Sequence, residues 1–236
     1  MSGGLVEADE LAHPPGASSA WSETWELRLV DPGRGIGLVV AVVRRPAERQ
    51  VSYLASVLGA ADGVVTVHEH DIDEPRGGGL ELRASGIWAD HVCETPFSHW
   101  SVGLEAFGLV LDEPEDAVTS GRGRAVPIGW DLEWEDDGGV EPIGGADDGY
   151  LAHGRAHGEL LLDDDTVELD GIGGRLHRWG TGPRLPGWTS RPVRSAGTRP
   201  VEGVRRAVAD DGVGAIVEWW LEAGSDGVVM ASRSRG

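Results

Sequence analysis

Regular alternation of apolar and polar residues constrains the fold of this chain most strongly. Between residues 128 and 135, Ile128, Trp130, Leu132 and Trp134 occupy every second position, and Gly or acidic residues lie between them. Because successive side chains of a strand point to opposite faces, this period of two predicts a strand with one buried face. Segments of similar character, separated by Gly, Pro or Asp, predict about a dozen strands, at 21–30, 36–43, 51–58, 64–70, 80–88, 98–111, 128–134, 150–162, 166–170, 175–179, 201–208, 215–221 and 228–232.

The fold class follows from the scarcity of helical periodicity. Residues 47–58 are the best helical candidate, and even there the pattern favours a strand. Amphipathic strands without covering helices must bury their faces against each other, which predicts an all-β protein: one antiparallel barrel, or two half-barrels that share an interface. We expect residues 1–20 to form a flexible N-terminal arm and residues 21–236 one β domain. Its pseudo-halves, about 21–111 and 125–236, flank a bridge at 112–124. The runs Gly77–Gly79 and Gly171–Gly174 are interpreted as turns.

Charge and cysteine content narrow the classes of partner. The formal net charge of −20 disfavours nucleic acid or an anionic membrane surface as a partner. The longest apolar run, Ile36–Val43, is too short to span a bilayer. Cys93 is the single cysteine and the first residues contain no apolar signal segment, so we expect a cytoplasmic protein. The 10 tryptophans imply either a large core or a pocket lined with indoles.

The stretch from Arg175 to Trp179 is the most informative candidate site. On a strand, Arg175, His177 and Trp179 share one face, and Leu176 and Arg178 take the other. A guanidinium beside an imidazole disfavours its protonated form, and an indole offers a π face to a cation. Such a trio in an apolar pocket could transfer a proton. The residues alone favour a structural histidine, half-buried against Trp179 and hydrogen-bonded to the backbone.

Three segments together resemble a calycin superfamily: residues 21–25 (WSETW), residues 127–134 (PIGWDLEW), and Tyr150 followed by Gly158 and residues 171–180 (GIGGRLHRWG). This superfamily includes carotenoid 1,2-hydratases (hydroxyneurosporene synthases), decalin-forming Diels–Alderases and survival-factor-like lipid binders. The resemblance covers residues 20–182 and implies a lipocalin/calycin-like barrel. It also implies that His177 and Trp179 lie in a substrate cavity, with Arg175 beside them as a catalytic candidate. Leu176 stands where the family commonly has Asp, so one acidic partner is missing.

These observations lead to a preferred function and two alternatives. We expect an apolar pocket that binds a small hydrophobic, isoprenoid- or polyketide-like molecule without a cofactor, lined by Trp25, Trp100, Trp130, Trp134 and Tyr150. The first alternative is a hydratase, isomerase or cyclase with His177 as acid or base. The second is a cupin-type metal enzyme with His68, His70 and Glu74 as ligands. For those three residues an exposed strand end is the preferred interpretation, and no metal is expected.

Overall fold

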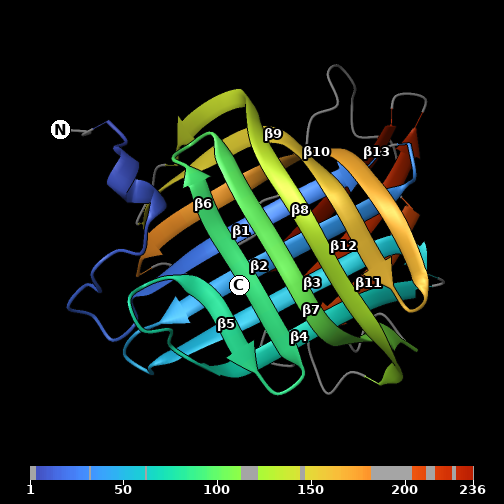
Figure 1. The fold of residues 1–236 in the computed structure, drawn as a ribbon, viewed down its shortest axis with the longest axis horizontal. Helices are drawn as coiled ribbons and strands as arrows, with labels where there is room; N and C mark the ends of the chain where they lie inside the picture. Colours follow the sequence, from blue (N-terminus) through green and yellow to red (C-terminus); the bar gives the residue numbers. More distant parts are fainter. Residues whose placement is uncertain are drawn as a thin grey trace.

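The fold was obtained as a computed structural model (Figure 1). It describes residues 4–31, 33–61, 63–112, 122–143 and 147–181. Near the C-terminus it describes the backbone of three strands: β11 (Val204–Asp210), β12 (Ile216–Gly224) and β13 (Gly227–Arg235). These three strands form an antiparallel sheet of their own, in the order β11-β12-β13.

Ten further strands form one antiparallel sheet, which confirms the predicted all-β fold class. They are β1 (Ser22–Asp31), β2 (Ile36–Arg45), β3 (Gln50–Ala61), β4 (Gly63–Asp73), β5 (Leu80–Ala84), β6 (Ile87–Thr95), β7 (His99–Leu111), β8 (Gly123–Pro142), β9 (Asp147–Leu162) and β10 (Asp165–Gly180).

The sheet closes on itself through eight of these strands. Its order is β4-β3-β2-β1-β10-β9-β8-β7-β6-β5, and β4 also pairs with the end of β7, where Val65 lies opposite Val110 and Thr66 opposite Leu109. The preceding part of the same β7 edge pairs with β6 instead. The ring is therefore close to a barrel but not an even one. It draws strands from both of the predicted pseudo-halves.

Two of the predicted strand boundaries are wrong. The segment 80–88 is not one strand but a hairpin of β5 and β6, turning at Gly86 with a φ of 82°, a backbone conformation that favours glycine. Conversely, residues 171–174 are not a turn, because β10 runs through them without a break. A Cβ at position 173 would lie 2.1 Å from the carbonyl oxygen of Arg28. Gly173 thus permits the close approach of β1.

Alternating side chains fill the interior of the ring. Trp130, Leu132 and Trp134 of β8 are buried while Asp131 and Glu135 are exposed, as the period of two predicts. On β9 the inward positions Ala152, Gly154 and Ala156 are small, and the outward residues His153 and His157 are exposed. Among the described residues, no helix is long and apolar enough to cross a membrane.

The N-terminal segment packs against one end of the ring. Residues 4–20 include a short 3₁₀ helix, η1 (Glu7–Glu10), which lies beside the strand ends in Figure 1. Glu10 is only 1% exposed, although it is a carboxylate near the start of the chain. The segment expected to be a flexible arm therefore contributes a buried charge to the interior.

Candidate functional site

Most of the predicted site residues point into the ring. The side chains of Arg175 and His177 on β10 are buried, and Trp179 on the same face is half-buried. The five aromatic residues predicted to line a pocket are buried as well, from four different strands: Trp25 on β1, Trp100 on β7, Trp130 and Trp134 on β8, and Tyr150 on β9. For Trp130 and Trp134, this burial is the one that the period of two predicts.

Arg175 lies in an aromatic cage. Its guanidinium carbon is 4.4 Å from the ring centroid of Trp100, 4.9 Å from that of Trp134 and 5.7 Å from that of Tyr150. These distances fall within the range of cation–π contacts. One guanidinium nitrogen also donates to the Tyr150 hydroxyl at 3.3 Å. Three aromatic faces therefore surround a buried positive charge.

Glu10 neutralises that charge from the N-terminal segment. The Arg175 guanidinium donates to Glu10 Oε1 at 2.6 Å, and the Trp100 indole donates to Glu10 Oε2 at 2.9 Å. The backbone N–H of Phe97 donates to Oε1 at 2.8 Å. The carboxylate thus accepts three hydrogen bonds, which is the condition under which a buried charge is tolerated.

His177 is held at both ring nitrogens. Nδ1 lies 2.8 Å from the carbonyl oxygen of Asp9, and Nε2 lies 3.0 Å from Glu23 Oε1. Because a carbonyl oxygen only accepts, Nδ1 must carry the hydrogen. If Nε2 carried no hydrogen, its lone pair would face a lone pair of the Glu23 carboxylate. A proton on Nε2, or a bound cation, would relieve this repulsion.

Glu23 is the centre of a larger polar cluster. His13 Nδ1 lies 2.8 Å from Glu23 Oε1, and the backbone N–H of His13 donates to the same oxygen at 2.9 Å. Arg44 donates to Oε2 at 3.1 Å and forms an ion pair with Glu74. His13 Nε2 is 3.5 Å from a carboxylate oxygen of Asp9.

The pKa values of this cluster are shifted in different directions. Burial lowers the pKa of His177, and the Glu23 carboxylate opposes that shift only in part. Burial also acts to lower the pKa of His13, but Glu23 and Asp9 outweigh it, so this pKa is raised. For Glu23, burial acts to raise the pKa, yet hydrogen bonds from His13 and His177 lower it overall. Glu23 is therefore held as a carboxylate.

Aromatic faces enclose the two histidines. The ring of His13 stacks on Trp179 with centroids 3.6 Å apart, and the ring of His177 stacks on Trp25 with centroids 4.6 Å apart. The ligand atoms of His13, Glu23 and His177 lie within 4.8 Å of one another. Within the described ranges, these three residues are the group that could hold a metal ion.

The predicted metal candidates are not brought together in this way. The rings of His68 and His70 are 6.1 Å apart, and Glu74 is paired with Arg44. His70 is exposed on the strand end. In the described part of the chain, these three residues do not form a group whose ligand atoms could share one ion.

Sequence reasoning missed Glu10, His13 and Glu23. Glu23 carried a signal, because it shares the period-two face of Trp25 and Leu27 and is thus an acid at an inward position. Glu10 and His13 lie in a segment without strand periodicity, so no pattern indicated that they reach the ring.

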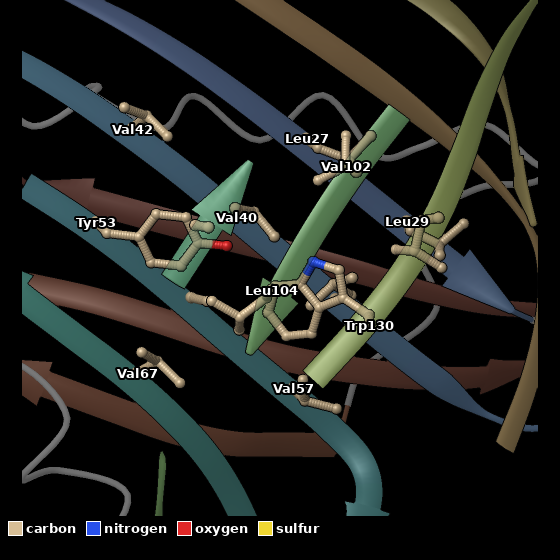
Figure 2. Close-up of a cluster of buried hydrophobic side chains, with 14 of the residues drawn as sticks. Leu27, Leu29, Val40, Val42, Tyr53, Val57, Val67, Val102, Leu104 and Trp130 are labelled. Atoms are coloured by element: carbon tan, nitrogen blue, oxygen red, sulfur yellow. The ribbon is translucent and has the colours of Figure 1, made fainter. Parts of the chain in front are cut away.

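Several polar atoms inside the ring have no partner. Trp25 Nε1, Trp130 Nε1, Trp134 Nε1 and the Tyr53 hydroxyl are buried without a hydrogen bond. In the view of Figure 2, the Tyr53 hydroxyl and the Trp130 nitrogen lie among the apolar side chains of the interior, near Val40 and Leu104. An unpaired buried polar group costs about 1–3 kcal/mol, and native proteins contain few of them. Their concentration in one interior requires an explanation.

A hollow also lies on the outer surface, with a volume of about 700 Å³. Its wall is mostly charged, and it is open to solvent beside the turn after β1. Residues that line it include Asp31, Arg34, His157, Glu168 and Asp170. It contains none of the predicted site residues.

Comparison with known proteins gives a family without an assigned activity. A family model described as a domain of unknown function (DUF7064) matches residues 6–189. That range includes most of the N-terminal segment and all ten strands of the large sheet. Among curated proteins, none matches the chain. Since the model covers most of the sequence, the chain belongs to the DUF7064 family.

Proposed function

We propose that the interior of the ring binds a small, largely apolar molecule that carries one or more hydrogen-bond acceptors. The observation that carries this proposal is the set of buried unpaired donors: three indole N–H groups, the Tyr53 hydroxyl and Arg175 Nε. A ligand carbonyl, ether or hydroxyl oxygen would satisfy them where no protein group does.

The shape and lining of the interior support the same proposal. A ring of eight strands is wide enough to be filled by side chains or to hold one small ligand. Several inward positions of β9 and β10 are small, among them Ala152, Ala156 and Gly171, which reduces the side-chain volume along part of that wall. Aliphatic side chains make up most of the remaining wall, and the six buried aromatic residues among them offer flat apolar surfaces.

The resemblance to calycins supports a hydrophobic ligand of isoprenoid or polyketide type. In that interpretation the segment from Arg175 to Trp179 faces the ligand chamber, and its inward orientation here is consistent with such a role. The net charge of −20 further disfavours anionic ligands.

The proposal is tested by titrating the protein with paired ligands and following tryptophan emission. Each pair consists of a terpenoid or polyene ketone and the hydrocarbon of the same size. We expect the ketones to bind more tightly, because only they can accept from Tyr53 or the indoles. Tyr53→Phe and Trp130→Phe should each weaken ketone binding by about 3–10-fold, the value of one neutral hydrogen bond, and leave hydrocarbon binding nearly unchanged.

Trp88→Phe is the matched control for these variants. Trp88 lies on β6 and its indole donates to Glu81 in an exposed pair, outside the ring interior. The control should lose emission without losing affinity. If no member of the panel binds, or if Trp88→Phe weakens binding as much as Trp130→Phe, the proposed function is wrong.

Acid–base catalysis by His177 on a bound alkene stays a prediction. Its motivation is the 3.0 Å contact between Nε2 and the Glu23 carboxylate, which resembles the pairing of a general base with its orienting acid. Both ring nitrogens are engaged by protein groups, so the N-terminal segment would have to move before the ring could reach a substrate. Turnover that persists in His177→Ala would exclude this role.

A further inference from the structure

We infer that His13, Glu23 and His177 form a binding site for a divalent transition-metal cation at the end of the ring closed by the N-terminal segment. The two imidazoles and one carboxylate come from three separate parts of the chain: the N-terminal segment, β1 and β10. This inference goes beyond the proposed function and does not depend on it, because the unpaired donors of the interior belong to other residues.

The spacing of the ligand atoms fits a metal. Nε2 of His177 and Nδ1 of His13 lie 3.0 Å and 2.8 Å from the same carboxylate oxygen of Glu23. For ligands at about 2.0–2.1 Å from a central ion, neighbouring ligand atoms are separated by roughly 2.9–3.4 Å in octahedral or tetrahedral geometry. The two contacts to Oε1 are thus close to this spacing, and all three ligand atoms lie within 4.8 Å of one another.

Both histidines have the outer partners that metal ligands require. The remaining nitrogen of His177 donates to the Asp9 carbonyl oxygen at 2.8 Å. The remaining nitrogen of His13 lies 3.5 Å from the Asp9 carboxylate. A carbonyl or carboxylate in this position fixes the tautomer and directs the other nitrogen to the ion. One residue, Asp9, thus orients both imidazoles.

The carboxylate is oriented as well. Arg44 donates to Glu23 Oε2 at 3.1 Å and leaves Oε1 directed at the two histidines. Glu74 pairs with Arg44 and balances its charge. An added divalent cation would therefore meet a carboxylate whose second oxygen is already occupied.

The ligand set indicates the class of metal. Two imidazoles and one carboxylate suit Zn²⁺, Co²⁺, Ni²⁺ or Fe²⁺ better than Mg²⁺ or Ca²⁺, which prefer sites made of oxygen atoms. Stacking of His13 on Trp179 and of His177 on Trp25 holds both rings in place and surrounds the site with apolar surface.

The full chain, freed of metal by a chelator and dialysed, is titrated with Zn²⁺ and separately with Co²⁺. We expect one equivalent of Zn²⁺ to bind with a rise in Tm, and Co²⁺ to give the visible absorption bands of nitrogen and oxygen coordination. Mg²⁺ should do neither. Loss of an outer-shell partner commonly costs about 10–100-fold in metal affinity, so His13→Ala and His177→Ala should each weaken Zn²⁺ binding by at least about 100-fold.

Two variants serve as controls. His153→Ala removes an exposed histidine of β9, and His70→Ala removes one of the neighbouring pair His68 and His70; both should bind Zn²⁺ as the wild type does. Circular dichroism establishes that each variant is folded. If His13→Ala or His177→Ala is misfolded, the Co²⁺ spectrum of the wild type decides. The inference is overturned if the wild type does not bind stoichiometric Zn²⁺. It is also overturned if His70→Ala loses Zn²⁺ binding while His13→Ala keeps it.

Discussion

Glu10 is expected to be the most sensitive single position in the N-terminal segment. Replacement by Ala removes the acceptor of three hydrogen bonds, from Arg175, the Trp100 indole and the Phe97 backbone. It also leaves the Arg175 guanidinium buried without its counter-ion, since both side chains are almost fully buried. Breaking a buried ion pair from one side costs about 3–5 kcal/mol, and we expect Glu10→Ala to lower the free energy of unfolding by that amount.

Urea denaturation followed by tryptophan emission measures this effect, and the midpoint should shift without a change in slope. Glu7→Ala is the matched control, because Glu7 lies in the same 3₁₀ helix and is exposed; its effect should stay within about 0.5 kcal/mol. The double variant Glu10→Ala with Arg175→Met should be more stable than the sum of the single effects predicts. A cost below about 1 kcal/mol for Glu10→Ala would refute the view that this segment is anchored by a buried charge pair.

Three further predictions concern burial and packing. Burial lowers the pKa of His91 to about 4. The contribution of the neutral ring to the stability of the folded protein is complete above the ordinary pKa of histidine, and it is lost as the pH falls toward 4. The wild type should thus lose about 2 kcal/mol more than His91→Gln between pH 8 and pH 5, and equal losses in urea titrations would contradict this. Gly154→Ala should lower the free energy of unfolding by about 1–3 kcal/mol, because its Cβ would lie 2.1 Å from the Glu135 carbonyl oxygen. The control Gly79→Ala should be neutral, since a Cβ there meets nothing within 4 Å. A neutral Gly154→Ala would refute the close packing. Burial raises the pKa of Cys93 to about 11, so its alkylation rate should still increase above pH 9, and a plateau there would argue against the shift.

The period of two was sufficient to predict the inward face of β8, because successive side chains of a strand point to opposite faces. Trp130, Leu132 and Trp134 are buried as that period requires. Arg175 and His177 share one face of β10, but no apolar alternation in their segment indicated that this face points inward. Ring closure depended on the short pairing of Val65 and Thr66 with the end of β7. Such a contact between distant strands leaves no local pattern.

Turn assignment failed where glycine has two physical uses. Gly86 provides a backbone with positive φ and ends β5, whereas Gly173 provides space beside the Arg28 carbonyl within a continuous strand. The sequence alone does not separate these uses, because both remove the Cβ atom. The N-terminal partners of Arg175 and Glu23 were missed for a different reason: Glu10 and His13 lie in a segment without strand periodicity.

A crystal structure of the protein with the tightest-binding ketone tests the central claim most directly. We predict density for the ligand within the ring, with its carbonyl oxygen within hydrogen-bonding distance of the Tyr53 hydroxyl or of the Trp130 indole. Density confined to the outer hollow beside Asp31 and Asp170 would contradict the account. So would an interior in which the protein's own side chains fill all of the space around Tyr53 and Trp130.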